Sequence, residues 1–352
     1  TENPVKGVDV FISDQHGELT LLDMMEASAN GKIPDDMPNT IVSDDDGDWR
    51  VNEQVVEEYD IVKHRIRWKK IPRVALSTVT PFQNTYGCPF KCGFCNFSLT
   101  KVHKKDMGML MDELLELAEQ GVSETVWFTD DNFFLNEKLI IEFCERFIEI
   151  GAPFAWNSFV RASSISPKTV DLLKRSRCSL LILGLESGSQ TILDNMWKKD
   201  TVEHYAESIK LLVEADIDLE LSFIFGYPGE CERTVQETME FINKVPTSPT
   251  QRSYLYLFKF NVLPLSPVFE QDEREKWGLT GNFADWRHDT MQSDQVQGFL
   301  KTVAQTAEPT VFNYIDPAMG LDRRQMKDVM VGRDKLARHI LANGNTDDQA
   351  AV

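Results

Sequence analysis

The sequence lacks three features: long apolar runs, an excess of basic residues and a dense set of cysteines. No stretch approaches the run of about 18 apolar residues that spans a bilayer, so we expect no membrane partner. Residues 1–4 lack the basic start and apolar core of a signal peptide. Six cysteines among 352 residues are too few for a disulfide scaffold. These absences predict a cytoplasmic protein.

The charge is strongly one-sided. Acidic residues number 56 against 37 basic ones, which gives a net charge of −19. A negative surface repels phosphate backbones, so a nucleic-acid partner is not expected. The apolar fraction of 42% is that of an ordinary globular protein with a core.

Three segments differ in pattern. Residues 1–75 hold one short strand and one helix, expected over residues 8–12 and 17–29, and an acidic run at residues 44–48 that we interpret as a solvated turn. From residue 76 to 265, strand-like runs alternate with helix-like runs. The strand-like runs after the first are 124–129, 154–160, 179–184, 219–225 and 254–261, and the helix-like runs are 107–120, 137–150, 167–176, 201–215 and 232–244. Residues 266–352 form a mixed segment with a frayed tail.

This alternation predicts βαβ units and a parallel sheet. The fold class is therefore α/β. About six units are too few for a closed eightfold barrel, so we expect an open, partial (β/α)6 barrel.

Three of the six cysteines lie within eight residues. Cys88, Cys92 and Cys95 have the spacing C-x3-C-x2-C. Thiolates this close on one loop are able to bind a single iron–sulfur cluster, and three of them leave one iron of a four-iron cluster open to another ligand. The neighbouring Phe94 is expected to shield the cluster from water.

The alternative is a zinc site in which His103 is the fourth ligand. Zinc sites usually pair two C-x2-C-type knuckles, and the sequence has no second one. The spacing therefore favours the iron–sulfur cluster.

The cysteine motif, placed after the first strand of a βα series, resembles the radical S-adenosylmethionine (SAM) superfamily over residues 76–265. The resemblance implies a 4Fe-4S cluster whose open iron is chelated by SAM. An electron from the reduced cluster then cleaves SAM to a 5′-deoxyadenosyl radical. A reductant such as flavodoxin or ferredoxin is the implied electron donor.

Polar residues near the ends of the predicted strands are candidate SAM ligands, because barrel active sites form at these ends. Asp130 is expected to face the SAM ammonium and Arg161 its carboxylate. Glu186 is a candidate to bind a polar edge of SAM, and Ser187 to hydrogen-bond a ribose hydroxyl. The turn at Gly226 is expected to bring the backbone close to the adenine. Each has an ordinary structural alternative as a capping, ion-pairing or turn residue. We assign no catalytic side chain. For His288 the sequence favours a structural role over a catalytic one.

Residues 184–189, 226–230 and 264–267, in this order, resemble the branch of the superfamily that carries a cobalamin-binding domain ahead of the barrel. Residues 13–22 resemble the end of that domain. The signature D-x-H-x-x-G is incomplete, because Gly17 directly follows Asp14-x-His16. Since the chain starts at Thr1 without Met, we expect a fragment or a processed form, with most of any cobalamin domain upstream.

The predicted function is that of a radical SAM enzyme, methyltransferase-like, acting on an unactivated carbon or phosphorus of a small molecule or peptide. Residues 286–291 faintly resemble the phosphinate methyltransferases. One alternative is a methylthiotransferase or another hydrogen-abstracting radical SAM enzyme without cobalamin. The other is a non-catalytic metal-binding module.

Overall fold

The computed structural model of the chain divides into two compact units, Thr1–His64 and Arg65–Val352. The residues it describes are 8, 10–13, 17–31, 35–43, 49–55, 65–97, 102–134, 136–246, 248, 250–307, 310–311 and 335. Residues 65–75, expected to close the N-terminal segment, belong to the second unit. The reason is local packing, because the Trp68 ring stacks on Phe82 with centroids 5.4 Å apart.

The N-terminal unit is a three-stranded antiparallel sheet and one helix. Its elements are β1 (Val10–Ile12), α1 (Glu18–Ala29), β2 (Thr40–Ser43) and β3 (Trp49–Val51), with strand order β1-β2-β3. Within this unit, Leu22 and Met25 of α1 are 51% and 63% exposed. The expected helix is present, but its apolar side is not covered. Asp14, His16 and the acidic run at 44–48 lie outside the described residues.

The second unit is built on a parallel sheet. Its strands are β4 (Val79–Phe82), β7 (Thr125–Phe128), β8 (Ala155–Val160), β9 (Cys178–Glu186), β10 (Asp218–Phe225), β11 (Ser253–Lys259) and the short β15 (Thr310–Val311). The order β15-β11-β10-β9-β8-β7-β4 places the six longer strands in chain order, all parallel. This confirms the predicted partial barrel.

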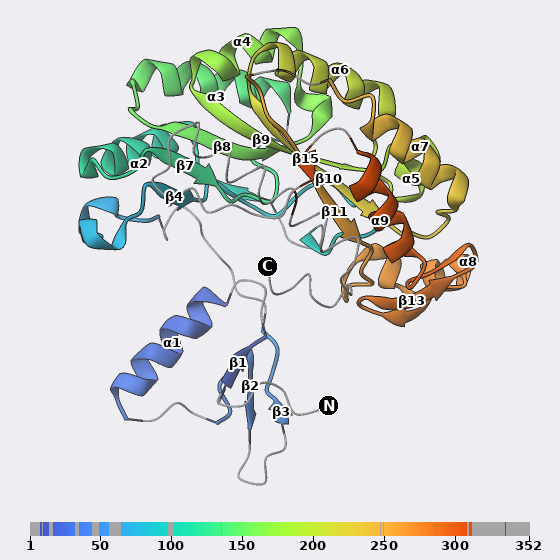
Figure 1. The fold of residues 1–352 in the computed structure, drawn as a ribbon. Coiled ribbons are helices and arrows are strands. Elements are labelled where there is room, and N and C mark those ends of the chain that lie inside the picture. The colour runs from blue at the N-terminus through green and yellow to red at the C-terminus, as the bar shows by residue number, and fades with distance from the viewer. Residues whose placement is uncertain are drawn as a thin grey trace. The chain divides into compact units, whose positions relative to one another are not determined.

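Helices connect consecutive strands and lie along one side of the sheet (Figure 1). They are α2 (Met107–Gln120), α3 (Glu137–Ile150), α4 (Pro167–Arg175), α5 (Gln190–Asn195), α6 (Val202–Glu214) and α7 (Glu232–Ile242). Their ends follow local sequence. Ser166 caps α4 with Pro167 in the first turn, Thr201 caps α6, and Gly151 ends α3 in the left-handed conformation.

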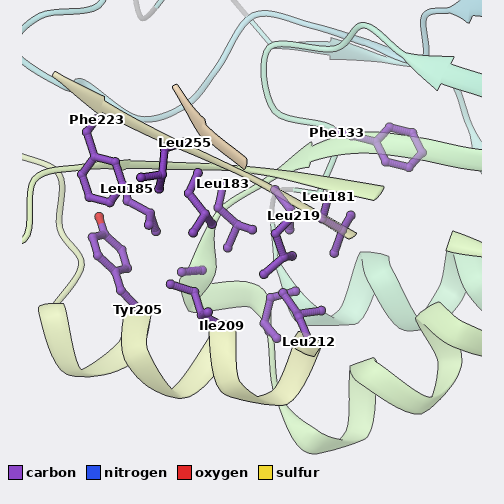
Figure 2. Close-up of a cluster of buried hydrophobic side chains, with 14 of the residues drawn as sticks. Phe133, Leu181, Leu183, Leu185, Tyr205, Ile209, Leu212, Leu219, Phe223 and Leu255 are labelled. Carbon is purple, nitrogen blue, oxygen red and sulfur yellow. The ribbon is translucent and has the colours of Figure 1, made fainter. Parts of the chain in front are cut away.

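The core lies between the sheet and these helices. Leu183 and Leu219 point from the sheet toward Ile209 and Leu212 of α6 (Figure 2). In β10, buried apolar residues alternate with half-buried residues. Since side chains of a strand alternate between faces, the sheet has a buried outer face under the helices and a more accessible opposite face.

The described part of the segment after the barrel, residues 266–307, mixes helices and short strands. It contains α8 (Gln271–Trp277), β12 (Thr280–Asn282), β13 (Asp285–His288), β14 (Met291–Gln292) and α9 (Val296–Thr306). Short 3-10 turns among the described residues of the second unit are η1 (Trp68–Lys70), η2 (Arg73–Ala75), η4 (Ala162–Ser164) and η5 (Pro267–Phe269). Trp286 and Leu300 join the barrel core. Among the described residues, no helix has both the length and the apolar composition of a bilayer span.

Candidate functional site

The three clustered cysteines lie on a loop that follows β4. The loop is closed at its base by an antiparallel pair of short strands, β5 (Thr85–Tyr86) and β6 (His103–Lys104). Since β4 is parallel to the other strands, the loop starts at the carboxyl-terminal edge of the sheet. Catalytic groups of barrel enzymes gather at this edge.

The three thiols influence one another. Burial raises the pKa of Cys88, and proximity to Cys92 raises it further. Burial, together with repulsion from Cys92, Cys88 and Glu186, raises the pKa of Cys95 to about 11. The thiols therefore share one poorly hydrated region. A bound cation would be needed to hold Cys88 and Cys95 as thiolates.

The loop has two metal-binding interpretations, an iron–sulfur cluster and a zinc site with His103. In the structure His103 pairs with Tyr86 at the base of the loop. Among the described residues, no three His, Cys, Asp or Glu side chains form a group that could hold a metal ion. The spacing of the three cysteines remains the ground for favouring the cluster.

Arg161 brings positive charge to the cysteines from the end of β8. Its Nη1 lies 3.9 Å from Cys92 Sγ, and its guanidinium lies 4.0 Å from the centre of the Phe90 ring. Its Nη2 donates to the carbonyl of Lys198. The buried Nε has no hydrogen-bond partner among the described residues, so this arginine retains a donor in the region expected to receive the SAM carboxylate.

Two adjacent carboxyl groups hold the loop. Asp130 Oδ1 accepts from the backbone N–H of Asn84 at 3.0 Å and from Thr85 Oγ1 at 2.6 Å. Asp131 Oδ2 accepts from the N–H of Gly87 at 3.0 Å. Burial raises the pKa of Asp130 to about 7. The predicted role of Asp130 toward the SAM ammonium stays a prediction. Its Oδ1 positions the loop, and its buried Oδ2 has no hydrogen-bond partner among the described residues.

Gly93 anchors the loop between the two cysteines. Its N–H donates to Met196 O at 2.7 Å, and its carbonyl accepts from Val268 N at 2.9 Å. A Cβ at Gly93 would overlap the hydroxyl of Tyr227, whose ring carbon Cζ would lie 3.3 Å away. Only glycine fits this approach.

We predict that Gly93→Ala destabilises the protein by about 1–3 kcal/mol through overpacking and lowers the iron content after reconstitution. The double variant Gly93→Ala/Tyr227→Phe, which removes the overlapping oxygen, is expected to recover part of both losses. Thermal melting and iron analysis measure the two effects. Gly298→Ala is the control, because a Cβ there meets no atom within 4 Å. Equal behaviour of the two alanine variants would contradict the predicted clash.

A buried ion pair lies beside the loop at the end of β9. Lys198 Nζ is 2.8 Å from Glu186 Oε1, and both side chains are less than a tenth exposed. The ammonium also lies 5.9 Å from the centre of the Phe94 ring. A Cβ at Gly184 would overlap the Glu186 carboxylate, so Gly184 makes room for the pair. Glu186 itself has a φ of 67°, a conformation that favours glycine and is found in non-glycine residues mainly at functional sites.

Lys198 was not predicted as a site residue. It follows Trp197 and precedes a second lysine, Lys199, and no local pattern separates the buried lysine from its exposed neighbour. Its role depends on the turn after α5, which brings its carbonyl to Arg161 and its ammonium to Glu186.

Three other candidates have structural partners. Ser187 is fully buried, and its hydroxyl pairs with Thr238 Oγ1 at 3.1 Å and accepts from the N–H of Ser189. These hydrogen bonds give Ser187 a structural role in the turn after β9, and its contact with a ribose hydroxyl stays a prediction. The Gly226 carbonyl lies 3.1 Å from His288 Nε2, and burial lowers the pKa of this histidine. His288 thus ties β13 to the end of β10, in agreement with its structural interpretation.

The Gly226 turn also contains a buried carboxyl group. Glu230 is fully buried and accepts from the Gly226 N–H. Burial raises the pKa of Glu230 to about 8. The carboxyl group of Glu230 thus holds its proton more tightly in the folded protein than in the unfolded chain.

We predict that Glu230→Gln reduces the pH dependence of stability. In the native protein the stabilisation is complete below the unfolded pKa near 4.5 and is lost as pH rises through about 8. Glutamine cannot ionise at this position. The slope of the unfolding free energy against pH between pH 5 and 8 is therefore expected to be smaller in the variant by up to about 1.4 kcal/mol per pH unit. Urea unfolding across this range measures the slope, with the exposed Glu207→Gln as the control. An unchanged slope would contradict a protonated Glu230.

Comparison with known proteins agrees with this geometry. Residues 82–242, from the end of β4 to the end of α7, match the Radical SAM superfamily. The chain contains a radical SAM domain. The predicted resemblance and enzyme class are confirmed at this level, and the superfamily implies both SAM and a 4Fe-4S cluster.

Relatives of the radical SAM domain carry several names. An uncharacterised methyltransferase of Pyrococcus horikoshii is 26% identical over 250 residues, covering 65% of this chain and 51% of the relative. The anaerobic magnesium-protoporphyrin IX monomethyl ester cyclase of Cereibacter sphaeroides is 34% identical over 182 residues, covering 49% and 29%. The chain spans about half the length of these curated relatives or less.

Solved structures share the fold. The cobalamin-dependent SAM radical enzyme OxsB aligns with a TM-score of 0.57 at 13% identity, covering 97% of this chain and 58% of that one. The radical SAM methyltransferase TsrM from Kitasatospora setae aligns with a TM-score of 0.53 at 18% identity, covering 74% and 53%. At these identities the likeness supports the architecture of the radical SAM domain and nothing finer.

Proposed function

We propose that this chain supplies the radical SAM part of a methyltransferase-like enzyme. Cys88, Cys92 and Cys95 would hold a 4Fe-4S cluster at the carboxyl-terminal edge of the sheet. When bound, that cluster supplies the electron that cleaves SAM to a 5′-deoxyadenosyl radical. The observation that carries the proposal is the placement of three cysteines on one anchored loop at this edge, with Arg161 Nη1 3.9 Å from Cys92 Sγ.

The surrounding side chains prepare this region for anionic groups. Arg161 and Lys198 are both less than a tenth exposed, and each lies over an aromatic ring of the loop, Phe90 or Phe94. Positive charge in a poorly hydrated site attracts anions more strongly than it does in water. Arg161 is therefore proposed to bind the SAM carboxylate, and Glu186, held by Lys198, to orient a polar group of SAM. The two phenylalanines exclude water from the thiols.

Methyl transfer is favoured by the names of relatives. Both the Pyrococcus horikoshii relative and TsrM are called methyltransferases, and one TsrM structure contains cobalamin and a [4Fe-4S] cluster. We propose cobalamin as a further cofactor of the longer protein. A small molecule or peptide is the proposed substrate, and a flavodoxin or ferredoxin the proposed reductant.

The second candidate is hydrogen abstraction without methyl transfer. It is supported by a relative named a ribosomal protein methylthiotransferase, from Hydrogenobaculum. Both candidates share the cleavage of SAM and differ in the need for cobalamin.

The test is anaerobic reconstitution with iron and sulfide, reduction with dithionite, and detection of 5′-deoxyadenosine from SAM by mass spectrometry. We expect a brown protein that forms this product. A protein that binds no cluster, or binds one and leaves SAM intact, would exclude both candidates and leave the metal-binding module. Titration of the full-length protein with hydroxocobalamin then separates them, because only the methyltransferase is expected to bind it.

A further inference from the structure

The acidic residues of the chain are unevenly distributed. Residues 61–105 include ten lysines and arginines and no aspartate or glutamate, so all 56 acidic residues lie outside this segment. At the average of the chain, a segment of this length would include about seven acidic residues. The segment contains all three loop cysteines. The part of the protein that is proposed to hold the cluster is therefore a basic segment within an acidic chain.

The structure describes residues 65–97 and 102–105 of this segment, and they gather around Phe82 at the end of β4. The Trp68 ring of η1 stacks on Phe82 with centroids 5.4 Å apart, and Lys105 Nζ lies 5.0 Å from the centre of the same ring. Lys105 directly follows β6, in which Lys104 pairs with Thr85 at the base of the cysteine loop. The basic residues before β4 and those after the loop are therefore neighbours in space.

Ion pairs neutralise only some of these basic residues. Three of them pair with glutamates on one side of α2, spaced three residues apart. The pairs are Arg65–Glu116, Lys69–Glu119 and Lys105–Glu113. Five others are exposed and form no ion pair among the described residues: Arg67, Lys70, Arg73, Lys91 and Lys104. We call these five residues the basic surface.

Apolar side chains accompany the basic surface. Val74, next to Arg73, is 94% exposed, and Phe97, two residues after Cys95, is 48% exposed. Protein interfaces combine apolar contacts with arginine, and complementary charge steers the partner onto them. A compact acidic protein is able to contact this segment alone. A long nucleic acid would extend over the remainder of the chain, where 56 acidic residues face 27 basic ones and repel phosphates.

The basic surface reaches the cysteines themselves. Lys91 directly precedes Cys92, and Lys104 lies at the base of the loop. In the proposed function, the cluster on this loop receives one electron for each SAM that is cleaved. A partner that docks here would therefore be next to the group that it reduces.

We propose that the basic surface docks an acidic one-electron carrier protein of the ferredoxin or flavodoxin class. One electron passes from the reduced carrier, which is oxidised, to the cluster, which is reduced, and no proton or chemical group is transferred. This inference rests on the proposed function, because it assumes that the loop holds the cluster.

The test is the rate at which the full-length chain, reconstituted anaerobically, accepts an electron from a plant-type [2Fe–2S] ferredoxin, which is acidic. Ferredoxin is reduced beforehand and freed of reductant, and stopped-flow absorbance follows the reaction. The methyl viologen radical, a small cation, is the reference donor. Salt screens attraction between opposite charges. We expect the ferredoxin rate to fall about tenfold between about 20 mM and about 300 mM salt, and the viologen rate not to fall.

Charge reversal locates the docking surface. Lys91→Glu/Lys104→Glu and Arg67→Glu/Lys70→Glu are each expected to slow reduction by ferredoxin about tenfold at low salt. Reduction by the viologen radical is expected to be no slower in either variant. Rates are expressed per bound cluster, so that a loss of iron is not mistaken for a loss of docking.

The matched control is Lys210→Glu/Lys244→Glu. Both lysines are exposed, one in α6 and one just after α7, and the change in net charge is the same. The control is expected to keep the ferredoxin rate of the unsubstituted protein within about twofold. Equal ferredoxin rates in all three double variants would overturn the proposal.

Equilibrium binding of oxidised ferredoxin to the full-length chain before reconstitution gives a second readout. Fluorescence anisotropy of labelled ferredoxin is expected to show dissociation constants about tenfold higher for the two basic-surface variants at low salt. A single-stranded RNA oligonucleotide is titrated in parallel. RNA binding that these variants abolish, without any ferredoxin binding, would overturn the proposal and assign the surface to nucleic acid.

Formation of 5′-deoxyadenosine with dithionite as the donor separates this inference from the proposed function. SAM cleavage with dithionite, but no charge-dependent reaction or binding with ferredoxin, would reject the inference alone. Charge-dependent ferredoxin binding by a chain that forms no cluster would reject the proposed function and leave the docking surface.

Discussion

Cys92→Ser is expected to remove the iron–sulfur chromophore and to reduce SAM cleavage to the background rate. Cys92 is the most buried of the three loop cysteines and the one beside Arg161. A serine hydroxyl is a far weaker iron ligand than a thiolate, and two remaining thiols cannot hold a four-iron cluster in a reactive form. Iron and sulfide content, visible absorbance and 5′-deoxyadenosine measure the loss.

Cys231→Ser is the matched control. Cys231 is a partly exposed cysteine at the N-cap of α7, outside the loop. Serine is a preferred residue at this position, so the fold and the cluster are expected to be retained. A Cys92→Ser protein that keeps full iron content and full cleavage would show that the loop is not the cluster site.

Lys105→Met is expected to destabilise the second unit by about 3–5 kcal/mol, because it leaves a buried carboxylate unpaired. Lys105 Nζ lies 2.8 Å from Glu113 Oε2, with side-chain exposures of 4% and 0%. The same ammonium donates to the carbonyl of Gln83 at 2.8 Å, directly before the cysteine loop. Thermal and urea unfolding measure the loss, and iron retention reports whether the loop is displaced.

The double variant Lys105→Met/Glu113→Leu separates charge from packing. Replacing both partners by apolar groups removes the unpaired charge, so most of the stability is expected to return. Lys69→Met is the control, because its pair with Glu119 is exposed and such pairs contribute about 0–1 kcal/mol. A Lys105→Met variant no less stable than Lys69→Met would contradict the argument.

The sequence was sufficient where the determinants are local. Helix ends at Ser166, Thr201 and Gly151 follow from the residues themselves. The βα alternation gave the parallel sheet, since helical and strand periods differ. The cysteine spacing located the loop because all three cysteines lie within eight residues.

The remaining features depend on contacts between distant segments. Three such contacts join residues that are not neighbours in the sequence, so no local sequence pattern reveals them. They are the Lys105 ion pair, the turn that brings Lys198 to Arg161, and the packing of Trp286 against Gly226. Asp130 shows the same limit. Its place after β7 was predicted, but its hydrogen bonds to Asn84 and Thr85 come from the segment that follows the neighbouring strand β4. Sequence alone could not choose between cofactor and loop as its partner.

The anchoring of the cysteine loop links it to several segments of the fold. Gly93 is tied to Met196 and Val268, Gly87 to Asp131, and Asn84 to Asp130. These partners follow three different strands, β7, β9 and β11. A packing change in any of these segments is therefore expected to shift the cysteines relative to one another, even when the substituted residue lies outside the loop.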